Sequence, residues 1–143
     1  MLAGPSMGEG KWSALALLRA WGIDFEVDGF MNAHGVSPDK AWRRGELSPS
    51  AKTPEHSGFS MVVADCSSPQ ELEADIVSFL SARSGLLEGL KKAGVRMELD
   101  IGLMVYPMVP KGFSLSPGLL GSLGNTGITL SITGYPCSDG EDQ

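Results

Sequence analysis

The chain has few of the side chains that bind metals or form nucleophiles. It has 143 residues, of which two are cysteines and two are histidines. Cys66 and Cys137 are far apart in the sequence, and His34 and His56 have no spacing typical of zinc ligands. We therefore expect no structural zinc site, no cofactor, and two reduced thiols in a cytoplasmic protein.

Long apolar runs and an excess of positive charge are also missing. No segment approaches the roughly 20 consecutive apolar residues of a membrane-spanning helix, and residues 1–5 lack the regions of a signal peptide. The formal net charge is -6, whereas binding to nucleic acid phosphates requires a basic face. The sequence therefore argues against nucleic acid and membrane partners.

The length and composition fit a single domain. A chain of this size, with 42% hydrophobic residues, can bury about two-thirds of the surface that its unfolded form exposes. We expect a flexible leader over residues 1–10, one α+β domain over residues 11–137, and a disordered acidic tail over residues 138–143.

The first half of the chain predicts strand, helix, connection and strand. Residues 12–20 are almost wholly apolar, which fits a strand buried on both faces or a short helix, and we favour the strand. Asp24 is the expected N-cap of a helix that ends at Gly35. We expect residues 36–57 to form an ordered connection without much regular structure, followed by a strand over residues 59–64.

A capping box opens the next helix. Ser68 is the expected N-cap, Pro69 occupies the first helical position, and Glu71 follows the cap by three residues. The helix should continue to Ala93 ahead of Gly94. Its apolar stripe consists of Leu72, Ile76, Phe79, Leu80, Leu87 and Leu90, and it contains Gly85 and Gly89, which can bend or divide it.

The second half predicts two strands with one polar face each. Residues 95–103 alternate between apolar and polar side chains, and residues 128–133 repeat the pattern after a short helix from Ser116 to Gly124. Half-polar strands argue against a parallel sheet covered on both sides. We therefore predict an α+β fold in β-α-β-α-β-α-β order, with a four-stranded, largely antiparallel sheet and helices mainly on one face.

One pentapeptide concentrates aromatic and charged side chains in the central connection. It comprises Trp42, Arg43, Arg44, Gly45 and Glu46. In a ligand clamp, one guanidinium would bind a carboxylate or phosphate while the indole offers a stacking face. In a structural role, an arginine would pair with Glu46 or cap a helix, and Gly45 would adopt a positive φ. Both interpretations stay open, and the structural one is favoured.

Two further candidates lie on or beside strands. Glu98 and Asp100 are alternate residues of one strand and so share a face, as a carboxylate pair or as solvated surface. His56 could act as a general base, although no partner stands at the spacing of a triad, so a loop histidine is favoured.

The order and spacing of several short segments carry a family resemblance. After the apolar first strand, the segments are Asp24–Phe30, Trp42–Glu46, Ser57–Phe59, Phe79–Leu80, Leu99–Gly102 and Leu115–Pro117. Through them the chain resembles, between residues 12 and 136, the bacterial family catalogued as domain of unknown function 4279. The resemblance implies a small α+β domain that usually stands alone and has no established activity. Where members often have an aromatic residue after the strand aspartate, this chain has Ile101.

Two classes of function fit these observations. The first is a protein-binding or interaction module, such as an immunity-protein-like factor or a regulatory adaptor, whose acidic strand face would bind a basic protein. The second is a small enzyme or binder that acts on an anionic metabolite through Arg43 or Arg44, with Asp100 or His56 as the base. We favour the first because the sequence shows no catalytic set.

Overall fold

A mixed β-sheet with helices on one side forms the framework of the protein. The computed structural model describes residues 12–46, 53–107 and 112–137, so the expected leader and tail lie outside the described residues. Five strands and four helices occur within these three ranges. In chain order they are β1 (Ala14–Gly22), α1 (Val27–His34), β2 (Lys40–Trp42), β3 (Ser57–Cys66), α2 (Pro69–Ala82), α3 (Ser84–Ala93), β4 (Arg96–Val105), α4 (Pro117–Thr126) and β5 (Ile128–Pro136).

The sheet differs from the prediction in strand number and in direction. Its strand order is β2-β3-β1-β4-β5, and all neighbours are antiparallel except β4 and β5, which run parallel. The additional strand, β2, has three residues within the segment expected to lack regular structure, too few to show a period. β5 is parallel to β4 because α4 crosses over the sheet between them and returns the chain in the same direction.

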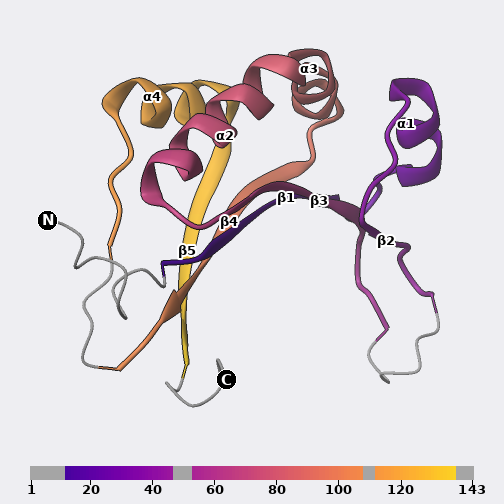
Figure 1. Ribbon diagram of the computed structural model, residues 1–143. Helices are drawn as coiled ribbons and strands as arrows, with labels where there is room; N and C mark the ends of the chain where they lie inside the picture. The colour runs from indigo at the N-terminus through magenta and orange to yellow at the C-terminus, as the bar shows by residue number, and fades with distance from the viewer. Residues whose placement is uncertain (1–11, 47–52, 108–111, 138–143) are drawn as a thin grey trace, which may run out of the picture.

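All four described helices lie on one face of the sheet (Figure 1). On this face β1 presents Ala14, Ala16, Leu18 and Ala20, all buried, and the small alanines let the helices approach the sheet closely. The predicted register of β4 is confirmed. Its apolar residues Met97, Leu99, Ile101 and Leu103 are buried beneath the helices, and its polar residues lie on the opposite face, here called the outer face.

The predicted N-cap at Ser68 is confirmed, whereas Glu71 accepts from the residue before the cap, and the helix that opens here is divided. The Ser68 hydroxyl accepts a hydrogen bond from the Glu71 backbone N–H at 3.3 Å, and the Glu71 carboxylate accepts one from the Ser67 backbone N–H at 3.2 Å. The helical backbone is interrupted at Arg83, with φ -111° and ψ 26°, rather than at a glycine. The division separates α2 from α3 and changes the direction of the chain (Figure 1).

Two other helix ends differ from their predictions. α1 begins at Val27 after Glu26, and Asp24 does not cap it; the Asp24 carboxylate lies 3.8 Å from the Arg44 guanidinium instead. α4 continues past Gly124 to Thr126, because the left-handed residue that ends it is Gly127, with φ 81°. None of the described helices is long and apolar enough to cross a lipid bilayer.

The middle of α2 contributes fully buried side chains to the core. Leu72 and Ile76 are fully buried as predicted, while Leu80 is only half-buried at the rim of the core. We expect Ile76→Ala to lower the free energy of unfolding by about 2–5 kcal/mol through lost burial and a residual cavity. Ser68→Ala should lower it by about 1 kcal/mol through the lost cap. Denaturant unfolding compares the two, and a cap variant that is less stable than the core variant would contradict this core.

Candidate functional site

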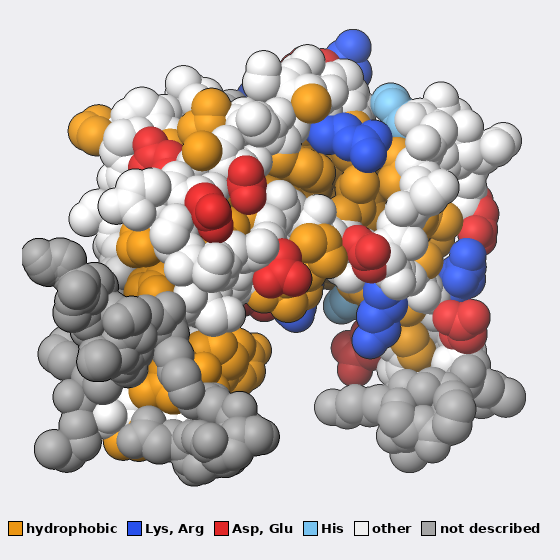
Figure 2. Space-filling view, in the orientation of Figure 1, with side chains coloured by type: hydrophobic (Ala, Val, Ile, Leu, Met, Phe, Trp, Pro, Cys, Tyr) orange, Lys and Arg blue, Asp and Glu red, His pale blue; other side chains and the backbone are white. Residues whose placement is uncertain are grey.

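The outer face of the sheet carries more apolar surface than a solvated sheet face needs. The outer side chains of β1 are Leu15, Leu17, Arg19 and Trp21, and Leu15 is 38% exposed. β1 pairs with β3 on one side and β4 on the other, so it is central in the sheet. Figure 1 shows no helix against this face, and hydrophobic side chains reach the surface beneath the helices in Figure 2. β1 thus has the sequence of a doubly buried strand, but the described residues cover only one of its faces.

An aromatic cluster, here defined as Trp21, Trp42 and His56, lies at one end of the outer face. The Trp42 indole N–H donates a hydrogen bond to His56 Nδ1 at 3.1 Å. The imidazole lies 5.9 Å from the Trp21 ring and 6.0 Å from the Trp42 ring, measured between centroids. The Arg96 guanidinium covers Trp21 at 5.8 Å from its ring centroid. The bond from Trp42 requires Nδ1 to be unprotonated, so a proton on this ring is held at Nε2.

A glycine in β3 gives Trp42 its place. Strand register puts Trp42 opposite Gly58, and Gly58 opposite Trp21. A side chain at position 58 would point from the outer face, where its Cβ would come within 2.8 Å of the Trp42 ring and within 2.7 Å of the Trp21 Cβ. The missing side chain therefore lets the indole of the short edge strand approach β1.

Arg43 of the pentapeptide is bound within the fold. Its guanidinium donates two hydrogen bonds to the Asp28 carboxylate of α1, at 2.6 and 3.1 Å. This contact holds the pKa of Asp28 below its usual value and raises the pKa of Arg43. The Arg43 backbone N–H donates to the Glu46 carboxylate at 3.1 Å, which closes the turn at Gly45, where φ is 78°. These contacts correspond to the structural interpretation for Arg43.

Arg44 is the more accessible of the two arginines. Its backbone N–H donates to the Ser57 hydroxyl at 2.9 Å, so the main chain is anchored to the start of β3. Its side chain is 57% exposed, and its ionic contact with Asp24 is long, at 3.8 Å. The structure therefore directs the arginines to different partners, while it brings Trp42 and His56 together.

The predicted carboxylate pair lies on the outer face, where it has Arg19 of β1 as a neighbour. Arg19 contacts Asp100 at 3.1 Å, and strand register places Arg19 opposite Glu98. The Asp100 side chain is only 15% exposed. Glu98 and Asp100 are therefore part of a cluster of both signs together with Arg19 and Arg96.

A shallow cavity of about 580 Å³ adjoins the aromatic cluster. Its lining includes Trp21, Asp24, Glu55, His56 and Arg96. This lining offers an aromatic wall and charges of both signs, which suits stacking and hydrogen bonding with a partner. The lining contains no cysteine that could act as a nucleophile. Cys66 lies elsewhere, and burial raises the pKa of its thiol to about 11, so this thiol stays protonated near neutral pH.

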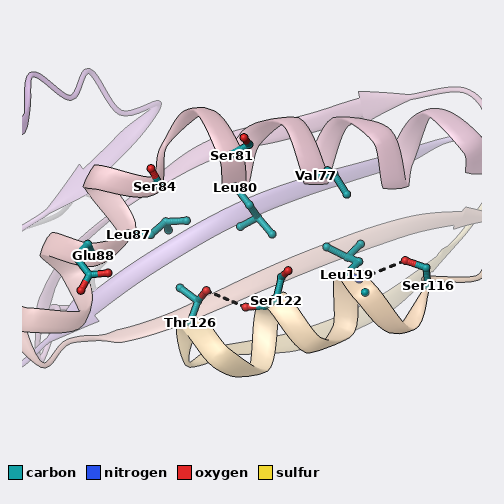
Figure 3. Close-up of a pocket in the computed structure, with 11 residues that line it drawn as sticks. Val77, Leu80, Ser81, Ser84, Leu87, Glu88, Ser116, Leu119, Ser122 and Thr126 are labelled. Atoms are coloured by element: carbon teal, nitrogen blue, oxygen red, sulfur yellow. Dashed lines mark hydrogen bonds between the residues drawn. The ribbon is translucent and has the colours of Figure 1, made fainter.

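A second hollow, of about 520 Å³, lies between α2–α3 and α4. Figure 3 shows Val77, Leu80 and Leu119 between the helices, with serine hydroxyls around them. Two hydroxyls of the lining form hydrogen bonds with the backbone of α4. Ser116 Oγ accepts from the Leu119 N–H at 3.2 Å, and Thr126 Oγ1 donates to the Ser122 carbonyl at 2.8 Å. The sequence analysis missed this groove because it arises from the break at Arg83 and the placement of α4.

Sequence analysis also missed the outer-face residues of β1 and Arg96. The alternation of side chains along β1 could have identified the two faces of this strand, because leucine, leucine, arginine and tryptophan alternate with small or apolar residues. It was hidden because both sets are largely apolar.

Comparison with known proteins identifies a family but no characterised relative. A family model described as "Domain of unknown function (DUF4279)" matches residues 11–136. No curated protein and no solved structure matches the chain.

The contact between Arg43 and Asp28 predicts a pH-dependent stability. Because folding lowers the pKa of Asp28, the contact stabilises the protein above the unfolded pKa of about 3.9 and is lost as the pH falls through the folded pKa. We expect Arg43→Ala to melt below the parent near neutral pH, with the difference shrinking as the pH falls below about 3.9. Thermal melts of Arg44→Ala provide the matched control, because its longer ionic contact should give little such dependence. A difference that stays constant with pH would contradict this role.

The close approach at Gly58 predicts a local rearrangement on substitution. Gly58→Ala places a methyl group against Trp42, Trp21 and the Ala20 carbonyl oxygen, so the backbone or the indole has to move. We expect a destabilised protein and a changed tryptophan fluorescence spectrum. Gly29→Ala is the control, because a methyl group there meets open space. Equal melting temperatures and spectra for the two variants would refute the proposed packing.

Proposed function

The chain belongs to the DUF4279 family, whose description assigns no activity, and we propose that this member is a protein-binding module that uses its outer face as the docking surface. The observation that supports the proposal most directly is the composition of β1. Where one face of a sheet is in contact with water, the strands normally carry polar side chains on that face. Here it presents Leu15, Leu17 and Trp21 without a described helix to cover them.

The outer face combines the residue types that contribute most to protein interfaces. Tryptophan, tyrosine and arginine are enriched among residues whose truncation weakens binding most. At one end of this face, His56 contacts both Trp21 and Trp42, and Arg96 covers Trp21. Tyr135 lies on the same face, next to Gly102. These side chains are held by strands, so binding needs little additional ordering.

Charge favours a basic protein as the partner, with mixed charges at the contact itself. The net charge of -6 raises the rate of encounter with a positively charged surface. On the outer face, however, Arg19 lies beside Glu98 and Asp100, so both signs of charge are present. A complementary surface therefore needs an acid to face Arg19 or Arg96 as well as bases to face the carboxylates.

The alternative function, a small enzyme or binder for an anionic metabolite, depends on Arg44. Arg43 is held by Asp28 and Glu46, whereas the Arg44 guanidinium is largely exposed beside Asp24, a residue of the cavity lining. In this alternative a carboxylate or phosphate replaces Asp24 at Arg44. His56 and Asp100 are its candidate bases.

Affinity capture with an outer-face variant tests the docking proposal. We expect Leu15→Glu to reduce recovery of the specific partner at least about tenfold, because a charge replaces an apolar contact on the central strand of the face. Val77→Glu is the matched control, since Val77 is 46% exposed but lies on α2, on the other side of the sheet. Quantitative mass spectrometry measures recovery, and circular dichroism verifies folding of both variants.

Two outcomes would overturn or replace the proposal. Equal recovery with Leu15→Glu and Val77→Glu would exclude the outer face as the docking surface. Co-purification of a small anion that is lost in Arg44→Ala but retained in Leu15→Glu would favour the metabolite alternative.

A further inference from the structure

The C-terminal part of the fold is uncharged in a chain that is otherwise rich in charge. Lys, Arg, Asp and Glu make up 20% of the protein, yet none occurs among residues 112–137. This stretch forms α4 and β5, which contact each other at one end of the sheet. Charged residues of other helices bind the two ends of α4. The Glu73 carboxylate accepts a hydrogen bond from the Ser116 N–H, and the Lys91 ammonium donates one to the Asn125 carbonyl.

β5 is an edge strand without the features that usually prevent further pairing. In the part of the chain that the structure describes, it pairs only with β4, over nine residue pairs and without a register shift. Edge strands are normally protected by lysines, internal prolines, bulges or short length. β5 spans nine residues, has no charged side chain, and its single proline is the terminal Pro136. Alternate backbone groups of β5 are thus available to another strand.

Exposed apolar side chains border this edge on both faces of the sheet. Ile132 is 53% exposed on the helix-covered face, and Tyr135 is 48% exposed on the outer face. Leu120 of the neighbouring α4 is also exposed. A strand added beside β5 would cover apolar surface on both sides while it satisfies the backbone of the edge.

We propose that β5 pairs antiparallel with β5 of a second copy of this chain, so that the two sheets become continuous. Antiparallel pairing of identical strands generates the two-fold symmetry that is commonest among homodimers. Overlap of the whole strand, Ile128–Pro136, places Ile132 at the two-fold axis, opposite Ile132 of the second copy. Tyr135 then faces Thr129 of the second copy, an aromatic and β-branched pair.

Charge is the reason to assign a second copy to this edge. Each copy carries a net charge of -6, so two copies repel when charged surfaces approach each other. Along β5 the facing side chains, including Ile132 at the axis, carry no like charges, because the strand consists of serine, threonine, glycine, tyrosine, proline and aliphatic residues. β5 and α4 themselves offer a basic partner no acidic side chain to pair with. The inference does not depend on the proposed function, because Leu15 is not part of the edge.

Sedimentation velocity of the full chain and two charged variants tests the proposal. We expect a reversible dimer over roughly micromolar to millimolar concentrations, because one strand pair buries little area. Ile132→Lys and Ile132→Glu should each weaken it at least tenfold, since like charges would face each other at the axis. An equimolar mixture of the two should restore dimers, because opposite charges then face each other.

Controls separate pairing from a loss of folding. Val77→Lys places the same charge at an exposed apolar site on α2 and should dimerise like the parent. Ile132→Thr keeps a β-branched residue in the strand and introduces no charge. It should weaken the dimer through the loss of apolar contact alone, and its circular dichroism spectrum should match that of the parent. A monomeric parent across the concentration range, a dimer unaffected by Ile132→Lys, or a mixture that stays monomeric would each overturn β5 pairing.

Discussion

The arrangement of the whole structure depends on how β1 is buried. β1 is the central strand, and its alanines beneath the helices allow α2, α3 and α4 to pack on one face. Its other face has leucine and tryptophan side chains of similar apolar character. Burying both faces would need a second layer, which the described residues do not supply. The free energy still available from covering this face, at roughly 25 cal/mol per Å² of apolar area, is the physical basis on which we propose a partner there.

The polar contacts of the central connection position one edge of that face. The short strand β2 could not hold Trp42 by itself, because it has only three residues. Arg43 anchors its end to α1 through Asp28, and the Arg44 backbone anchors it to Ser57. Between these anchors Trp42 lies at Gly58 and donates its N–H to His56. The charged pentapeptide thus has an evident structural task, and the surface that it orients is aromatic rather than cationic.

The sequence predicted those parts of the fold that have a local cause. The capping box at Ser68, the register of β4 and the end of α1 at Gly35 each follow from a few neighbouring residues. The sheet order, the parallel direction of β5 and the break at Arg83 depend on how distant elements pack. Trp42 and His56 could be named as candidates, but Trp21 and Arg96 join them only through strand register.

Two regions of the molecular surface differ in charge, and therefore in how they could recognise a partner. The outer face places arginines beside carboxylates, so a complementary surface must match both signs at the correct positions. The α4 and β5 edge has no charge to match, so specificity there has to come from strand register and shape. If two copies join at β5, their outer faces become parts of one continuous sheet surface. Each aromatic cluster then lies away from the axis, because Trp42 and Trp21 lie on the far side of β4 from β5. Pairing at the edge therefore leaves the aromatic clusters open, and Tyr135 is the residue that the two surfaces share.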